Sequence, residues 1–194
     1  MPDKRRAWVS IRNDTGKPML GISLVHKYSN VYKEQKQWEI LGIGETTKDP
    51  LAVDYNTGFL TTGKDWWFIT WFHPDMKYVW YSSPNNMRGF FDFADNLLPD
   101  AISGAAGAAA GLGTSFTGGG AIVVGAAAAS AAKLVTSSLF NSETTEGFKQ
   151  HILEKEDEGQ LMEIVIHRDT VEFKSKSGTS STNIRGADVP QKKF

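Results

Sequence analysis

Asp65-Trp66-Trp67-Phe68-Ile69-Thr70-Trp71-Phe72 is the stretch that decides the fold, because its side chains are apolar on both faces of an extended strand. Successive side chains of a strand point to opposite faces, so such a run is typical of a central strand covered on two sides. The chain turns at His73-Pro74-Asp75, and Lys77–Tyr81 returns as the partner strand. We expect one face to carry Trp67, Ile69 and Trp71 and the other to carry Trp66, Phe68 and Phe72.

Shorter alternating runs extend this pattern in both directions. Ala7–Arg12 alternates apolar and polar side chains, and after a break at Asn13–Gly16 the alternation returns over Met19–Val25. Late in the chain, Gln160–Ile166 places Met162, Ile164 and Ile166 on one face, and Thr170–Lys174 follows as a further strand. Regular strands with Gly, Asn, Asp and Pro at their turns predict a mainly β fold, an antiparallel sandwich or barrel.

Composition narrows the possible functions. The 194 residues include 40% hydrophobic and 22% charged residues, enough apolar side chain for a proper core. The formal net charge of −1 provides no basic field, so we expect no nucleic-acid partner. The absence of cysteine excludes disulfides, thiol catalysis and cysteine-ligated zinc. The N-terminal residues show no apolar signal core, so we expect a cytoplasmic protein or one exported by a non-classical route.

A long run of small residues separates the early strands from the late ones. Residues 101–132 contain no charged residue and no histidine, and they consist mostly of alanine and glycine. Since alanine is the strongest helix former, we expect a helical hairpin, residues 101–116 and 121–140 joined at Thr117–Gly120. The candidate membrane-inserting or interface residues are Leu112, Phe116, Ile122, Val123 and Val124, with Gly107 and Gly111 as a G-x-x-x-G helix contact.

The energy of membrane insertion for this run is close to balance. Its six large apolar side chains contribute only about −2 to −4 kcal/mol, and the glycine, serine and threonine residues oppose them. Three interpretations stay open: a conditional membrane element, a hairpin packed on the β-domain or in an oligomer interface, and a flexible insertion. The resulting domain scheme is a sandwich of residues 1–95 and 145–176, an Ala/Gly-rich helical insertion at 96–144 and a flexible tail at 177–194.

The motifs of common enzymes are missing or incomplete. Gly58–Lys64 matches G-x-x-x-x-G-K, but Asp65 replaces the magnesium-binding Ser or Thr and a strand follows where a helix is required. The four histidines have no metal-binding spacing, and no G-x-S-x-G is present. We therefore expect no enzyme activity, no cofactor and no metal site.

The clustered aromatic residues are more informative. Trp66, Trp67, Trp71, Tyr78, Trp80 and Tyr81 fall on two neighbouring predicted strands. Many of them belong in the core, but alternation sends some to the opposite face. Exposed Trp and Tyr suit a lipid headgroup or a sugar, since the ring is apolar and its edge carries a donor. These six residues are the candidate lipid- or glycan-binding aromatics.

Three sequence phrases suggest a family. Ala7–Gly16, the strand over residues 22–29, and Asp54–Gly58 with Asp65-Trp66-Trp67 resemble the PUD-type domains of fungi and nematodes, whose nematode members are up-regulated in long-lived animals. The resemblance covers residues 6–82 and extends to strands at 160–174. It implies a jelly-roll-like β-sandwich, similar in build to aegerolysins and actinoporins, which bind membrane lipids and in some cases form pores. The Ala/Gly-rich insertion departs from the compact family domain.

Together these observations predict a non-enzymatic lipid- or membrane-binding protein, with pore formation in a defence or toxin role as a further expectation. The alternative is a soluble glycan- or protein-binding sandwich whose hairpin mediates oligomerisation. The expected partners are membrane lipid, bound conditionally, a glycan, and further copies of the chain or another protein in an oligomer.

Overall fold

The computed structural model describes residues 2–58, 61, 63–83, 133, 136, 137, 140, 141 and 145–188. The first six strands are β1 Asp3–Asn13, β2 Met19–Tyr28, β3 Tyr32–Leu41, β4 Leu51–Thr57, β5 Asp65–Phe72 and β6 Tyr78–Ser82. After these come β7 Lys149–Gln150, the 3-10 turn η1 Lys155–Asp157, β8 Leu161–Ile166, β9 Thr170–Lys174 and β10 Thr179–Asp188. The prediction of a mainly β protein is confirmed.

The strands form one continuous sheet in the order β3-β2-β5-β6-β10-β9-β8-β1-β4, with β7 paired to β5. Nearly all neighbours in the sheet are antiparallel, but β1 and β8 run parallel, with Ile11 opposite Ile164. The prediction of a wholly antiparallel sheet is therefore wrong. Parallel neighbours need a long connection, and here most of the chain lies between the two strands.

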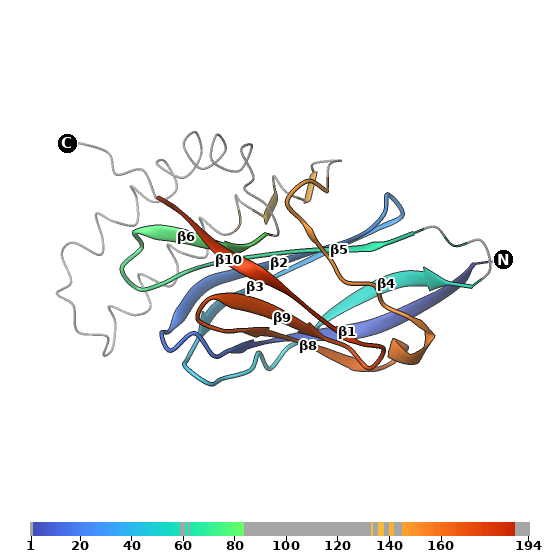
Figure 1. Cartoon of the computed structure of the whole chain (residues 1–194), viewed down its shortest axis with the longest axis horizontal. Helices are drawn as coiled ribbons and strands as arrows, with labels where there is room; N and C mark the ends of the chain where they lie inside the picture. Colours follow the sequence, from blue (N-terminus) through green and yellow to red (C-terminus); the bar gives the residue numbers. More distant parts are fainter. Residues whose placement is uncertain are drawn as a thin grey trace.

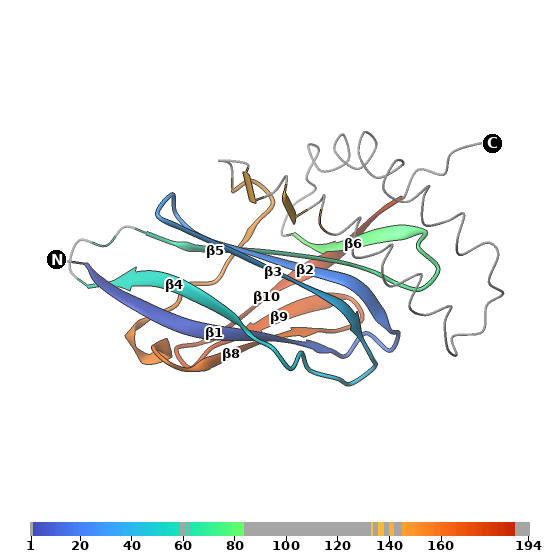
Figure 2. The same cartoon turned by 180° about the vertical axis from the view of Figure 1, so that it is seen from behind.

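Strand β10 joins the two layers of the molecule. Thr179–Asn183 pairs with β9, whereas Ile184–Asp188 pairs with β6, so the strand passes from one layer into the other. Figures 1 and 2 show the layer of β2, β3, β5 and β6 facing the layer of β1, β4, β8 and β9. The sheet is thus mixed, nearly closed and barrel-like, which corrects the predicted sandwich of two separate sheets. The predicted flexible tail at 177–194 is also wrong for Thr179–Asp188.

The interior lies between the two layers. Trp67, Ile69 and Trp71 belong to its buried cluster, and Met162, Ile164 and Ile166 enter it from β8. Phe68 and Phe72 are buried on the other face of β5, where Phe148 packs on Phe68 with ring centroids 5.2 Å apart. This division of β5 into two apolar faces confirms the expectation drawn from the sequence.

The predicted helical hairpin finds no support in this structure, because nearly all of the 96–144 insertion lies outside the described residues. Within it, Lys133, Thr136, Ser137, Phe140 and Asn141 have helical backbone. Thr136 contacts the Ser23 hydroxyl on β2. Among the residues that the structure describes, no helix has the length and apolar character needed to cross a bilayer.

Candidate functional site

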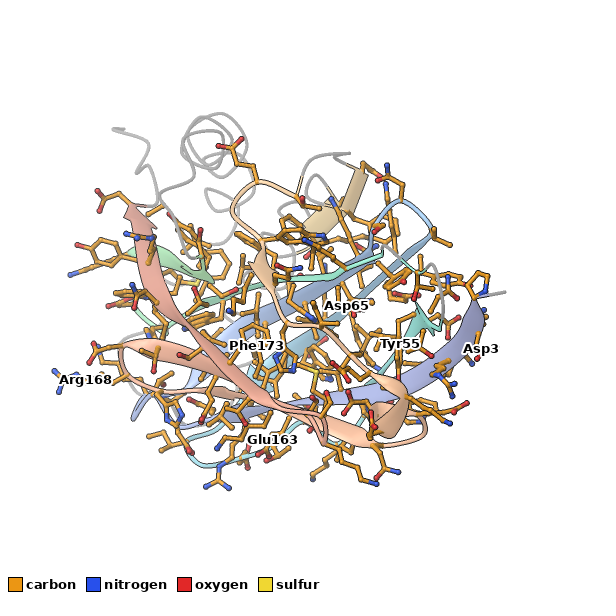
Figure 3. All side chains as sticks on the ribbon, turned by 45° about the vertical axis from the view of Figure 1, so that its right-hand side comes forward. Asp3, Tyr55, Asp65, Glu163, Arg168 and Phe173 are labelled. Atoms are coloured by element: carbon orange, nitrogen blue, oxygen red, sulfur yellow. The ribbon has the colours of Figure 1, made fainter. Side chains whose placement is uncertain are left out.

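A cavity of about 630 Å³ lies where the β1–β2, β5–β6 and β8–β9 turns meet. These three turns gather at one end of the molecule in Figure 1, and Arg168 marks that end in Figure 3. We call this space the turn-end cavity. Its lining consists of Asp14, Thr15, Gly16, Lys17, Trp71, His73, Trp80, Arg168, Asp169 and Ile184.

The β1–β2 turn is held in one conformation by a buried asparagine. The Asn13 amide donates to the carbonyls of Lys17, Leu41 and Gly42 at 2.9, 3.1 and 3.0 Å. Its carbonyl oxygen accepts from the Thr15 amide at 3.1 Å and from the Thr15 hydroxyl at 2.8 Å. An Asx turn of this kind fixes the backbone locally, so Asp14–Lys17 form a rigid wall of the cavity.

The aromatic wall of the cavity comes from the ends of β5 and β6. The Trp71 side chain is almost fully buried, and the Trp80 side chain is half-buried. Both indole nitrogens are buried, and neither has a hydrogen-bond partner among the described residues. The Trp80 ring also packs against Gly186 of β10. A residue with a side chain at position 186 would place its Cβ 3.1 Å from the Trp80 ring.

His73 completes this wall as a hydrogen-bond acceptor. Its Nδ1 lies 2.9 Å from the Pro18 carbonyl, which can only accept, so Nδ1 carries the proton. Burial lowers the pKa of His73, and the hydrogen bond to Pro18 does not offset this. At neutral pH the ring is therefore neutral, with Nε2 free of a proton and able to accept.

Four of the other lining residues are charged. Asp14 is half-buried and accepts from Arg12 Nε at 3.0 Å, while Asp169, Lys17 and Arg168 are exposed at the rim. The cavity thus combines the rings of Trp71 and Trp80, whose indole nitrogens are themselves buried, with carboxylate and imidazole acceptors. This set can hold a ligand rich in hydroxyl groups.

The predicted aromatic residues do not form one surface. Trp67 lies in the interior and donates from Nε1 to the His151 carbonyl at 2.8 Å. Tyr81 is buried on the outer face of the same layer, stacked on Phe68, and Trp66 is half-buried between β2 and β7. Trp71 and Trp80 meet at the turn-end cavity, and Tyr78 beside Trp80 is 40% exposed.

Other predicted residues lie elsewhere or outside the described chain. Lys64 of the G-x-x-x-x-G-K match leads directly into strand β5, as the sequence indicated. Within the described part of the chain, no group of His, Asp and Glu residues could hold a metal ion. The candidate membrane or interface residues Gly107, Gly111, Leu112, Phe116, Ile122, Val123 and Val124 all lie outside the described residues.

Of the ten residues that line the cavity, sequence reasoning proposed only Trp71 and Trp80 as site residues. It identified the turns that contain Asp14, His73 and Asp169, but it did not show that these turns meet. The available signal was the polar, charged composition of the turns that flank the aromatic strands.

A comparison with protein families gives one match. A family model described as "Up-Regulated in long-lived daf-2" matches residues 3–184, which span nearly the whole chain. This match confirms the PUD-type resemblance and extends it across the Ala/Gly-rich insertion. A search of curated proteins finds no match.

Proposed function

The chain belongs to the family of proteins described as up-regulated in long-lived daf-2, and from that premise we propose that it is a non-enzymatic carbohydrate-binding protein. The proposed site is the turn-end cavity. One observation carries the proposal: two buried indole N–H groups, without partners among the described residues, belong to rings that line the same cavity.

Unpaired buried donors favour a ligand with hydrogen-bond acceptors. A buried N–H without a partner costs about 1–3 kcal/mol, and a ligand oxygen removes that cost once a rotation of the ring turns the N–H toward the cavity. Trp71 and Trp80 each carry such a group on the edge of an apolar ring. A sugar matches both properties, because its C–H face packs on an aromatic ring while its hydroxyl oxygens accept.

The other lining groups complement the hydroxyl protons of a sugar. Asp14 and Asp169 carry carboxylates, and neutral His73 offers a free ring nitrogen. Each hydroxyl both donates and accepts, so a cavity that presents both kinds of partner can fix its orientation. A volume of about 630 Å³ is also of the size typical of small-ligand sites.

Screening on a glycan array, followed by calorimetry with the strongest hit, tests the proposal. Trp80→Phe keeps a ring but removes the indole donor, so we expect affinity to fall about two- to tenfold. Trp38→Phe is the matched control, because the Trp38 indole already donates to the Asp49 carbonyl at 2.9 Å. An array without hits, or a hit whose affinity is unchanged by Trp80→Phe and Asp169→Asn, would overturn the proposal.

The uncharged run of residues 101–132 supports a second candidate function, conditional membrane insertion with pore formation as its outcome. A charge deep in a bilayer costs about 2.5–3.5 kcal/mol, so Val123→Asp should abolish dye release from liposomes. If the wild-type protein releases no dye and Val123→Asp instead breaks a stable oligomer, the run serves assembly.

A further inference from the structure

The two ends of the sheet, β3 and β4, meet along a seam held by side chains. They stand at opposite ends of the strand order, so no backbone ladder joins them in the described part of the chain. Contacts from β3 bridge the gap: Glu34 Oε1 accepts from the Asp54 amide at 3.3 Å, and the Tyr32 hydroxyl donates to Asn56 Oδ1 at 3.3 Å. The near closure of the barrel therefore depends on a few polar side chains.

Glu34 is also held from inside by a buried histidine. His26 Nδ1 lies 2.8 Å from Glu34 Oε2, and His26 Nε2 lies 2.9 Å from Asp65 Oδ1. The remaining Asp65 oxygen accepts from the Leu153 amide at 2.9 Å. The side chains of His26 and Asp65 are fully buried, and Figure 3 labels Asp65 within the body of the molecule, whereas the Glu34 side chain is 20% exposed.

This geometry fits a charged imidazole. With Glu34 and Asp65 both ionised, each can only accept a hydrogen bond, so both ring nitrogens of His26 then carry protons. The Trp67 ring, with its centroid 4.2 Å from that of His26, adds a favourable aromatic contact for the cation. His26 is thus an imidazolium with one carboxylate at each nitrogen.

We propose that His26 is a proton-controlled latch on the β3–β4 seam, closed while both ring nitrogens are protonated and opened by the loss of one proton. A neutral imidazole has a single N–H, and its bare nitrogen would face a carboxylate oxygen. Asp65 is fully buried and fixed by Leu153, so it keeps the remaining N–H. Glu34 reaches solvent, so it is the partner that leaves, and its bond to the Asp54 amide is lost with it.

The charges around the latch decide the pH at which it opens. Burial disfavours the cation, but the hydrogen bonds to Asp65 and Glu34 outweigh burial and raise the pKa of His26. Arg6 also interacts with Glu34, and Tyr28, Tyr55 and His151 interact with Asp65. Because the pKa of His26 is raised in the folded protein, the latch is still closed at a pH equal to the ordinary histidine pKa. It opens as the pH rises through the higher pKa of His26 in the folded protein.

Long-range ¹H–¹⁵N NMR of the histidine rings, run beside amide hydrogen exchange, tests the latch on the full chain. We expect both His26 nitrogens to be protonated at pH 7. As His26 loses a proton, protection of the Asp54 amide should fall at least tenfold relative to the Asp14 amide, which donates to the Ile166 carbonyl of β8 at 2.8 Å and so makes no bond to Glu34. Glu34→Gln should make Asp54 protection independent of His26, whereas His167→Gln, at a partly exposed histidine, should change nothing.

Two results would overturn the proposal. One is a His26 ring with a single proton at pH 7. The other is a loss of protection that affects Asp54 and Asp14 equally, since this would report global unfolding and not the opening of a seam. Should Glu34→Gln fail to fold, the wild-type comparison of these two amides still decides the matter.

Discussion

Ile164→Ala tests the parallel pairing that brings β8 into the core. Ile164 is fully buried, opposite Ile11 on β1 and Phe173 on β9. The change removes three carbons, each worth about 0.8 kcal/mol in transfer from water. The cavity left behind adds to this, so we expect the free energy of unfolding to fall by about 3–4 kcal/mol, measured by urea denaturation.

Leu161→Ala is the matched control on the same strand. Its side chain is 60% exposed, so the same kind of truncation should change the free energy of unfolding by less than about 0.5 kcal/mol. A shift of register by one residue would exchange the buried and exposed faces of β8. Equal costs for the two variants would therefore refute the register of β8 against β1.

Gly63→Ala should destabilise the fold by about 2 kcal/mol, since its Cβ would meet the ring of buried Tyr28 at 2.1 Å. Gly178→Ala, with no atom within 4 Å of its Cβ, should leave the thermal midpoint nearly unchanged. The hydrogen bond from Arg6 lowers the pKa of Asp54 from 3.8 to about 2. The ionised Asp54 therefore stabilises the folded state fully above pH 3.8, and this stabilisation is lost as the pH falls through 2. Asp54→Asn should accordingly cost about 1–2 kcal/mol in urea unfolding at pH 7 and almost nothing below pH 2; an equal cost at both values would contradict the assignment.

Most strands that bury a face were predicted from the sequence, but β4 was not, although its Leu51, Val53 and Tyr55 are buried. Strands that bury little were missed. Residue alternation placed Met162, Ile164 and Ile166 inside, as the structure does. Strands β3 and β10 were missed, because most of their side chains are exposed or half-buried and leave no apolar period. The composition of Thr179–Asp188 therefore suggested a loose tail, although this strand joins the two layers.

The site depended on long-range pairings that a single sequence does not encode locally. Alternation puts Trp67 and Trp71 on the same face of β5, and only the position of Trp71 near the strand end makes it part of the cavity. Asp14 and Asp169 line the same cavity because β1 pairs in parallel with β8, although most of the sequence separates these two strands. Periodicity shows which face is buried, but it does not show which turns meet.

The most direct test of carbohydrate binding at the turn-end cavity follows the six tryptophan indole N–H signals by ¹H–¹⁵N NMR during titration with the strongest array hit. We expect large shifts for Trp71 and Trp80, whose donors become paired. We expect much smaller shifts for Trp38 and Trp67, whose indoles already donate to the carbonyls of Asp49 and His151. Saturable binding that leaves the Trp71 and Trp80 signals unmoved would contradict it.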